Sequence, residues 1–240
     1  MMRKVERTSS NPNVPPGRGW RLDGKVVCVV GGGLTDRVAD GLRDMGAHVV
    51  SAPWPKRDDY SKASLLVART LRRTEGLDAL VVMVDGMVGD GTLLQQSNSG
   101  WRRTITDPLG SAFSIVQGAT KLMAKRSGGA IIIVGPAQES MSRISTTRVV
   151  GGGLSTLVRS LAIAFGQYEI TVNGIIPGQL SAAQRTRRKN PDRTTGRQAD
   201  LSDIVGPIAY LASRDTTYLT GQVILVDGGL SLRTALPESR

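Results

Sequence analysis

The chain has 240 residues, of which 40% are hydrophobic, 21% charged and only 4% aromatic. This length and composition suit one medium-sized domain with an aliphatic core, and they exclude fibrous and wholly disordered proteins. One cysteine and one histidine exclude a disulfide framework or a Cys/His metal site within one chain. Since no apolar run approaches the roughly 18 residues of a membrane helix, we expect a cytoplasmic protein with no membrane contact and no metal.

The formal net charge of +11 is concentrated in two segments. Residues 1–21 combine Arg and Lys with Pro, Ser and Asn, a composition that predicts a flexible basic arm before a single domain over 22–240. The second segment, Arg185 to Arg197, carries six basic residues. Its field could attract an acidic ligand or an acidic carrier protein, while the alternative is a solvated loop.

From residue 22 onward, apolar runs alternate with helical periodicity. Lys25–Val30 predicts a strand buried on both faces; Gly31–Gly33 predicts a tight turn; a helix follows up to Gly46, and Ala47–Ser51 predicts the next strand. The alternation continues with helices expected over 64–73, 112–125, 153–165 and 204–212, and strands over 80–84, 130–134, 171–176 and 223–226. Strands and helices in this order predict an α/β fold with a doubly wound parallel sheet.

Several segments resemble the short-chain dehydrogenase/reductase family, especially 3-oxoacyl-(acyl carrier protein) reductases. The longest runs from Leu201 to Leu232 and contains DIVGPIAYLASRDTTYLTGQVILVDGGLSL; Ile170–Gly178 (ITVNGIIPG) resembles the strand and Pro-Gly turn beside the nicotinamide. Leu77–Val81 and Gly129–Val134 match the central strands. The resemblance implies a Rossmann-like sheet in dimers or tetramers that pack through the helices at 112–125 and 153–165.

The phosphate-binding turn of that family, T-G-x-x-x-G-x-G, is altered here. Gly31 matches the first glycine, but Thr35 and Arg37 stand where the later glycines belong, and the turn is about two residues short. Asp36 adds a carboxylate close to where phosphates would sit, and like charges repel.

The turn therefore predicts no bound cofactor, with weak binding of NADP or NAD as the alternative. The residues that would contact such a cofactor are Gly31 and Gly33 in the turn and Pro177 and Gly178 after the later strand.

Catalysis in the family uses Asn, Ser, Tyr and Lys, and the resemblance places these roles on other residue types. The asparagine falls on Asp107, the serine on Gly135 or Pro136, the tyrosine on Thr147 and the lysine on Gly151. Neither Tyr nor Lys occurs between Met141 and Gly153. An aliphatic hydroxyl cannot replace an acidified phenol as a proton donor, so ordinary family redox chemistry is not expected.

These substitutions predict a non-redox pseudoenzyme or partner subunit. A first alternative is a repurposed pocket that catalyses cyclisation, dehydration or isomerisation of a polyketide-like or acyl substrate. A second is an NADP-dependent oxidoreductase with unusual catalytic groups. Candidate pocket residues are Asp85, Ser140 and Arg148, the last able to bind an anion but unable to relay a proton.

An oligomer is expected, either of identical chains or with an active member of the family. Leu154, Leu157, Leu161 and Phe165 recur every three or four residues. With Val158 and Ala162 they predict an apolar helix face wider than one sheet contact needs, and a second subunit would cover the excess.

Overall fold

A computed structural model describes residues 20–55, 65, 67, 69, 74, 76–84, 97–125, 128–137, 146–180 and 194–233, except the side chain of Thr147. The predicted arm over 1–21 lies outside this part apart from Trp20 and Arg21. The Trp20 ring packs against Tyr210 at a centroid distance of 4.4 Å. Arg21 pairs with Asp23 at 2.7 Å.

Six parallel strands form one sheet in the order β2-β1-β3-β4-β5-β6. Their bounds are β1 Val26–Gly31, β2 His48–Pro53, β3 Ala79–Met83, β4 Gly129–Val134, β5 Ile170–Pro177 and β6 Val223–Val226. Every pairing is parallel, for example Gly31 with Pro53 and Pro177 with Val226. The predicted doubly wound α/β fold is confirmed.

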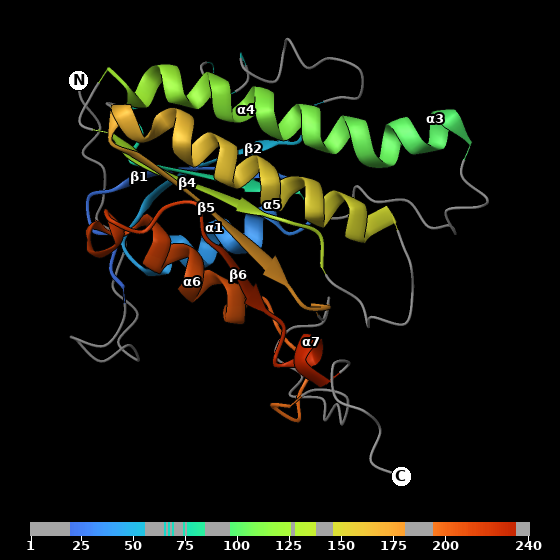
Figure 1. Cartoon of the computed structure of the whole chain (residues 1–240). Coiled ribbons are helices and arrows are strands. Elements are labelled where there is room, and N and C mark those ends of the chain that lie inside the picture. The colour runs from blue at the N-terminus through green and yellow to red at the C-terminus, as the bar shows by residue number, and fades with distance from the viewer. Residues whose placement is uncertain are drawn as a thin grey trace.

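Alternate residues of each central strand enter different halves of the core. Cys28 and Val30 of β1 pack with the helices on one face, whereas Val27 and Val29 pack with those on the other. Burial on both faces explains why β1 is a continuous apolar run. Figure 1 shows α4 and α5 side by side on one face and α1 and α6 on the other.

The helices differ from the expected ones mainly at their starts. The described helices are α1 Thr35–Asp44, α3 Asn98–Trp101, α4 Asp107–Met123, α5 Thr146–Phe165, α6 Ser202–Ala212 and α7 Leu230–Arg233, with a π-helical segment at Arg102–Thr106. α4 and α5 begin five and seven residues before the predicted positions. Of the helix expected over 64–73, residues 65, 67 and 69 are described and helical.

The apolar stripe of α5 faces the sheet and not a second subunit. Leu154 and Leu161 are 2% and 4% exposed, and Leu157 and Phe165 pack against the same core. β5 and α4 therefore cover most of this stripe, and the expected oligomer stays a prediction. Among the described residues, the segment Arg148–Tyr168 alone has the length and apolar composition of a membrane span; its buried leucines are those of a core helix.

Asn173 ties β5 to the turn before β6. Its side chain is buried, donates from Nδ2 to the Leu219 carbonyl at 2.7 Å and accepts at Oδ1 from the Gln222 amide at 3.0 Å. Since buried amide and carbonyl groups need partners, this one residue satisfies two backbone groups at the edge of the sheet.

We expect Asn173→Ala to lower the free energy of unfolding by about 2–4 kcal/mol, because it leaves two backbone groups unsatisfied. Urea denaturation of wild type and variant measures the loss. Gln167→Ala, on an exposed residue, is the control. A loss at Asn173 no larger than the control would contradict this assignment.

Candidate functional site

The carboxyl ends of the strands form one continuous edge. Backbone hydrogen bonds extend the ladder past the strands, from the Trp54 amide to the Gly31 carbonyl and from the Gly135 amide to the Ile175 carbonyl, both at 2.8 Å. Since each strand leads into a crossover helix, the amino ends of α1, α4 and α5 lie at this edge too. In open α/β sheets, ligands bind at this edge.

A cavity of about 430 Å³ opens between the start of α1 and the end of β2. Its lining consists of Gly31, Gly32, Thr35, Asp36 and the run Ser51–Trp54. Gly31, which the sequence suggested as a cofactor contact, lines this cavity, whereas Gly33 does not. The end of β2 was not predicted as part of the site, although the register of β1 with β2 follows from their parallel pairing.

Gly31 and Thr35 are both tightly packed in the wall of this cavity. A Cβ on Gly31 would lie 2.5 Å from both the Met83 Cβ and the Thr35 Oγ1, so this position has no room for a side chain. Thr35 is 4% exposed, and its hydroxyl has no hydrogen-bond partner. A buried hydroxyl without a partner in the wall of a cavity suits a ligand oxygen or a bound water.

The positions of the family's catalytic residues lie on neighbouring elements at the same edge. Asp107, at the first turn of α4 directly after the π-helical segment, is 4% exposed. Gly135 and Pro136 are buried after β4, and a Cβ on Gly135 would meet Ile176 and Leu154 at an ordinary 3.5 Å.

Thr147 and Gly151 lie in the first turns of α5. A Cβ on Gly151 would meet no described atom within 4 Å. A Cβ on Gly153 would lie 3.0 Å from Leu109. The start of α4 therefore packs against the part of α5 that carries these positions.

Of the remaining candidates, Asp85 and Ser140 lie outside the described residues. Arg148 is exposed on the first turn of α5. Pro177 and Gly178 are buried at the end of β5, where the Gly178 amide donates to the Val226 carbonyl at 2.8 Å. They lie on the same edge as Gly31, with β3 and β4 between the two strands.

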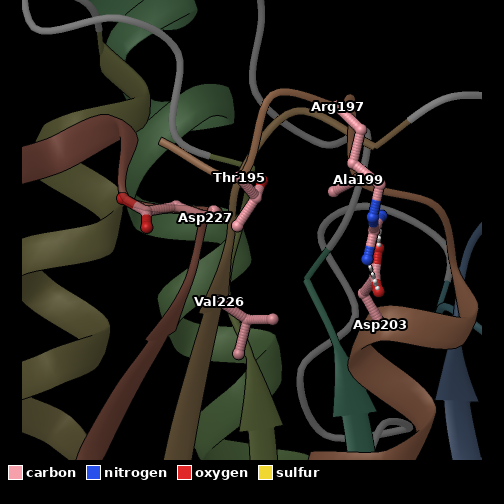
Figure 2. A pocket seen from close by; sticks show the side chains of 7 residues that line it. Thr195, Arg197, Ala199, Asp203, Val226 and Asp227 are labelled. Carbon is pink, nitrogen blue, oxygen red and sulfur yellow. Dashed lines mark hydrogen bonds and ion pairs between the residues drawn. The ribbon is translucent and has the colours of Figure 1, made fainter. Parts of the chain in front are cut away.

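A second cavity of about 210 Å³ lies beside the end of β6, lined by residues that include Thr195, Arg197, Asp203, Val226 and Asp227. Arg197 donates to both carboxylate oxygens of Asp203, at 2.7 and 2.6 Å. Figure 2 shows these two groups facing each other, with the Asp227 carboxylate pointing away. The sequence indicated Arg197 as part of an anion-attracting segment, but its guanidinium is engaged by Asp203; residues 185–193 lie outside the described part.

The bidentate contact with Arg197 holds the pKa of Asp203 below its ordinary value. The Asp200 amide also donates to Asp203, at 2.9 Å. The pair therefore fastens the 197–200 turn to the start of α6. Elsewhere in the described ranges no three metal-ligating side chains cluster, and burial raises the pKa of the Cys28 thiol to about 12, so it is inert at neutral pH.

Residues 35–231 match the family described as enoyl-(acyl carrier protein) reductase. The chain belongs to the short-chain dehydrogenase/reductases. It is 31% identical over 184 residues to L-rhamnose 1-dehydrogenase (NAD(P)(+)) of Azotobacter vinelandii, covering 72% of each chain. It is 30% identical to L-rhamnose-1-dehydrogenase of Scheffersomyces stipitis, covering 87% of this chain and 96% of that one.

Solved structures of this family share the fold. A putative short-chain alcohol dehydrogenase from Sinorhizobium meliloti superposes with a TM-score of 0.76 at 25% identity, over 89% of this chain and 98% of that one. A gluconate 5-dehydrogenase from Burkholderia cenocepacia, in complex with NADP and tartrate, gives the same TM-score at 21% identity, over 89% and 97% of the chains.

These relatives correct the predicted function. They are named as dehydrogenases, so the prediction of a non-redox pseudoenzyme or partner subunit is wrong. The residues Thr147 and Gly151 do not place the chain outside this family.

We expect Gly31→Ala to lower the free energy of unfolding by about 1–3 kcal/mol, because the new methyl overlaps Met83 and Thr35. Gly33→Ala is the matched control: a Cβ there meets no described atom within 4 Å, so its effect stays below about 0.5 kcal/mol. Urea titration compares them. Equal losses at the two glycines would contradict the close packing at Gly31.

The Arg197–Asp203 pair predicts a pH dependence of stability. Because the folded-state pKa of Asp203 lies below the ordinary 3.8, the pair stabilises the fold above that value, and the stabilisation is lost as pH falls through the folded-state pKa. Both groups are partly exposed, so Asp203→Asn costs about 1 kcal/mol or less near neutral pH. Denaturation at several pH values should show this difference shrinking below about pH 4; a constant difference would contradict it.

Proposed function

We propose that this protein is a nicotinamide-dinucleotide-dependent oxidoreductase that acts on a hydroxyl or carbonyl group with catalytic groups other than the Tyr–Lys pair. The observation that carries the proposal is the position of the 430 Å³ cavity, at the carboxyl ends of β1 and β2 and the start of α1, within a chain of this family. In Rossmann-like sheets the dinucleotide binds across these elements.

The residues of the cavity fit the adenosine half of such a cofactor. Its volume lies within the range of small-molecule sites, Gly32 leaves the turn without a side chain at its rim, and the Thr35 hydroxyl lacks a partner. Trp54 supplies an aromatic wall at the other side. Asp36 lines the same cavity. A relative named as NAD(P)(+)-dependent supports a bound cofactor in place of the expected absence of one.

When bound, the nicotinamide ring supplies the acceptor or donor of a hydride. The chain must move the accompanying proton, and we assign this role to Asp107. It is a buried carboxylate at the start of α4, two residues before Leu109, which packs against Gly153 of α5. In the oxidation direction its carboxylate takes the proton of the substrate hydroxyl.

Calorimetric titration with NAD⁺, NADH, NADP⁺ and NADPH tests the proposal. We expect at least one pair to bind with a Kd of about micromolar. Turnover is then measured by nicotinamide absorbance with L-rhamnose, gluconate and a 3-hydroxyacyl thioester, the substrate classes named for relatives. Absence of binding at millimolar concentrations would refute the proposal.

Asp107→Asn should lower kcat by about 10²–10⁴-fold with cofactor affinity unchanged, because the amide cannot accept the proton. Asp215→Asn, on an exposed surface residue, is the control. If Asp107→Asn has the wild-type kcat, another group must move the proton. The result of the cofactor titration would still stand.

We also propose that the outer face of α4 and α5 pairs with a second copy of this chain. Ile163 is 86% exposed there, and Phe113 and Val149 are exposed as well. On α5, small residues recur every four positions, at Gly152, Thr156 and Ser160. Small side chains let two helices approach closely.

Ile163→Glu should convert the dimer to a monomer, because it places a carboxylate in the apolar part of this face. Light scattering at micromolar concentration measures the mass. The fold should survive, since Ile163 contributes little to the core. Tyr218→Glu, at a fully exposed position outside both helices, should leave the dimer unchanged. A monomeric wild-type protein would refute the interface.

A further inference from the structure

The layer of helices formed by α3, the π-helical segment, α4 and α5 exposes charge of one sign. Figure 1 shows α3 continuing the line of α4, with α5 alongside. Over the described ranges 97–125 and 146–168, all six basic residues are exposed, namely Arg102, Arg103, Lys121, Lys125, Arg148 and Arg159. The one acid in these ranges, Asp107, is only 4% exposed. The described outer surface of this layer is therefore basic and offers no carboxylate.

Elsewhere in the described part of the chain, basic side chains are paired with acids. The ion pairs join Arg21 to Asp23, Lys25 to Asp78, Arg43 to Asp40 and Arg197 to Asp203. Lys121 and Arg159 have no ion-pair partner among the described residues. Their charges are therefore available to a ligand or a partner from outside this part of the chain.

These two basic residues share the outer face of α4 and α5 with apolar side chains. On α5, Arg159 precedes Ile163 by about one helical turn, so the two lie on the same side of the helix. On α4, exposed residues recur every four positions at Phe113, Gln117 and Lys121. Apolar and basic groups are thus interleaved on the face that we propose as the contact with a second copy.

The packing of Gly153 against Leu109 sets the register between the two helices. α4 and α5 run in the same direction, because each is a crossover between strands of a parallel sheet, and each advances about 1.5 Å per residue. Arg159 follows Gly153 by six residues, and Phe113 and Gln117 follow Leu109 by four and eight. Arg159 therefore lies level with the stretch of α4 between Phe113 and Gln117, in the middle of the face.

A symmetric dimer through this face brings like charges together. A two-fold contact uses the same patch on both partners, so Arg159 and Lys121 of each copy meet a surface whose described residues supply no carboxylate. The exposed Ile163 and Phe113 favour the contact, because it removes them from water. The basic groups oppose it. A bound anion with two or more charges removes this opposition.

We propose that the paired α4–α5 faces bind a multivalent inorganic oxyanion, held by Arg159 and Lys121 of both copies, and that this anion strengthens the dimer. The inference rests on the proposed self-association and not on the proposed oxidoreductase activity. A guanidinium can donate two parallel N–H bonds to one oxyanion. A monovalent anion offsets only one charge, so the effect depends on the valence of the anion and not on ionic strength alone.

Sedimentation equilibrium of the full chain tests the proposal. The dimer Kd is measured in sodium chloride, sodium sulfate and sodium pyrophosphate, all at an ionic strength of about 0.15 M, so that general screening is the same. We expect a Kd at least about tenfold lower in the two multivalent salts. Because sulfate also strengthens apolar burial in general, variants must separate a bound anion from this solvent effect.

Arg159→Gln should remove most of the difference between the salts and lower the Kd in chloride toward the wild-type value in sulfate, because it removes the charge that the anion binds. Arg214→Gln is the matched control. It removes the same charge from an exposed residue in the 3₁₀ turn after α6, outside α4 and α5, and should keep the wild-type difference. Circular dichroism confirms that both variants fold.

Charge reversal gives a second test that needs no multivalent anion. The double variant Lys121→Glu, Arg159→Glu is mixed with wild type in sodium chloride. We expect a mixed dimer with a Kd at least about tenfold lower than that of wild type alone, because opposite charges then meet in the contact. Native mass spectrometry identifies the mixed species by its mass.

The outcomes separate the anion site from the self-association. Equal wild-type Kd values in the three salts, an Arg159→Gln salt response equal to wild type, or absence of the mixed dimer overturns the anion site and leaves self-association standing. A chain that stays monomeric in every salt overturns both, and binding of poly-L-glutamate by that monomer would assign the face to an acidic partner. The nicotinamide titration is independent of all these results.

Discussion

Burial of the sheet on both faces is the constraint from which the remaining architecture follows. A parallel strand such as β1, with Val27 and Val29 on one side and Cys28 and Val30 on the other, needs a layer of helices over each face. Each connection must then cross from one end of the sheet to the other. As a result every strand delivers its carboxyl end, and every crossover helix its amino end, to one edge. Residues as distant as Gly31, Asp107 and Gly151 are gathered there by this topology.

The central strands β3, β4 and β5 were predictable because almost all of their residues are buried and they therefore form continuous apolar runs; the partly exposed edge strand β6 is an apolar run as well. β3, β4, β5 and β6 begin and end within about a residue of the apolar runs that indicated them. The starts of α4 and α5 could not be predicted from the sequence, because Pro108 and the glycines at 151–153 are residues that commonly end a helix. Pro108 lies in the first turn of α4, directly after the π-helical segment, where the backbone already departs from the α-helical hydrogen-bond pattern. Gly153 packs against Leu109, whereas a Cβ at Gly151 or Gly152 would meet no described atom within 4 Å.

Part of the candidate site could be predicted from the sequence. The glycine turn indicated the end of β1, which lines the cavity, and the structure leaves no room for a side chain at Gly31 beside Met83 and Thr35. The contribution of Ser51–Trp54 and the unsatisfied hydroxyl of Thr35 depend on packing that no local pattern encodes. The function was misjudged because the absence of the tyrosine and lysine was taken as the loss of the reaction, whereas the relatives that this chain resembles are named as dehydrogenases.

The glycine run in α5 has a consequence for motion. Each of Gly151, Gly152 and Gly153 disfavours the helix by about 1 kcal/mol relative to alanine, whereas the later turns contain Leu154, Val158 and Leu161 locked into the core. The stability of α5 therefore increases along the helix: its first third opens readily, and the rest stays helical. Amide hydrogens should exchange fastest in the first turns of α5, so local unfolding reaches first the edge of the sheet where the strands end.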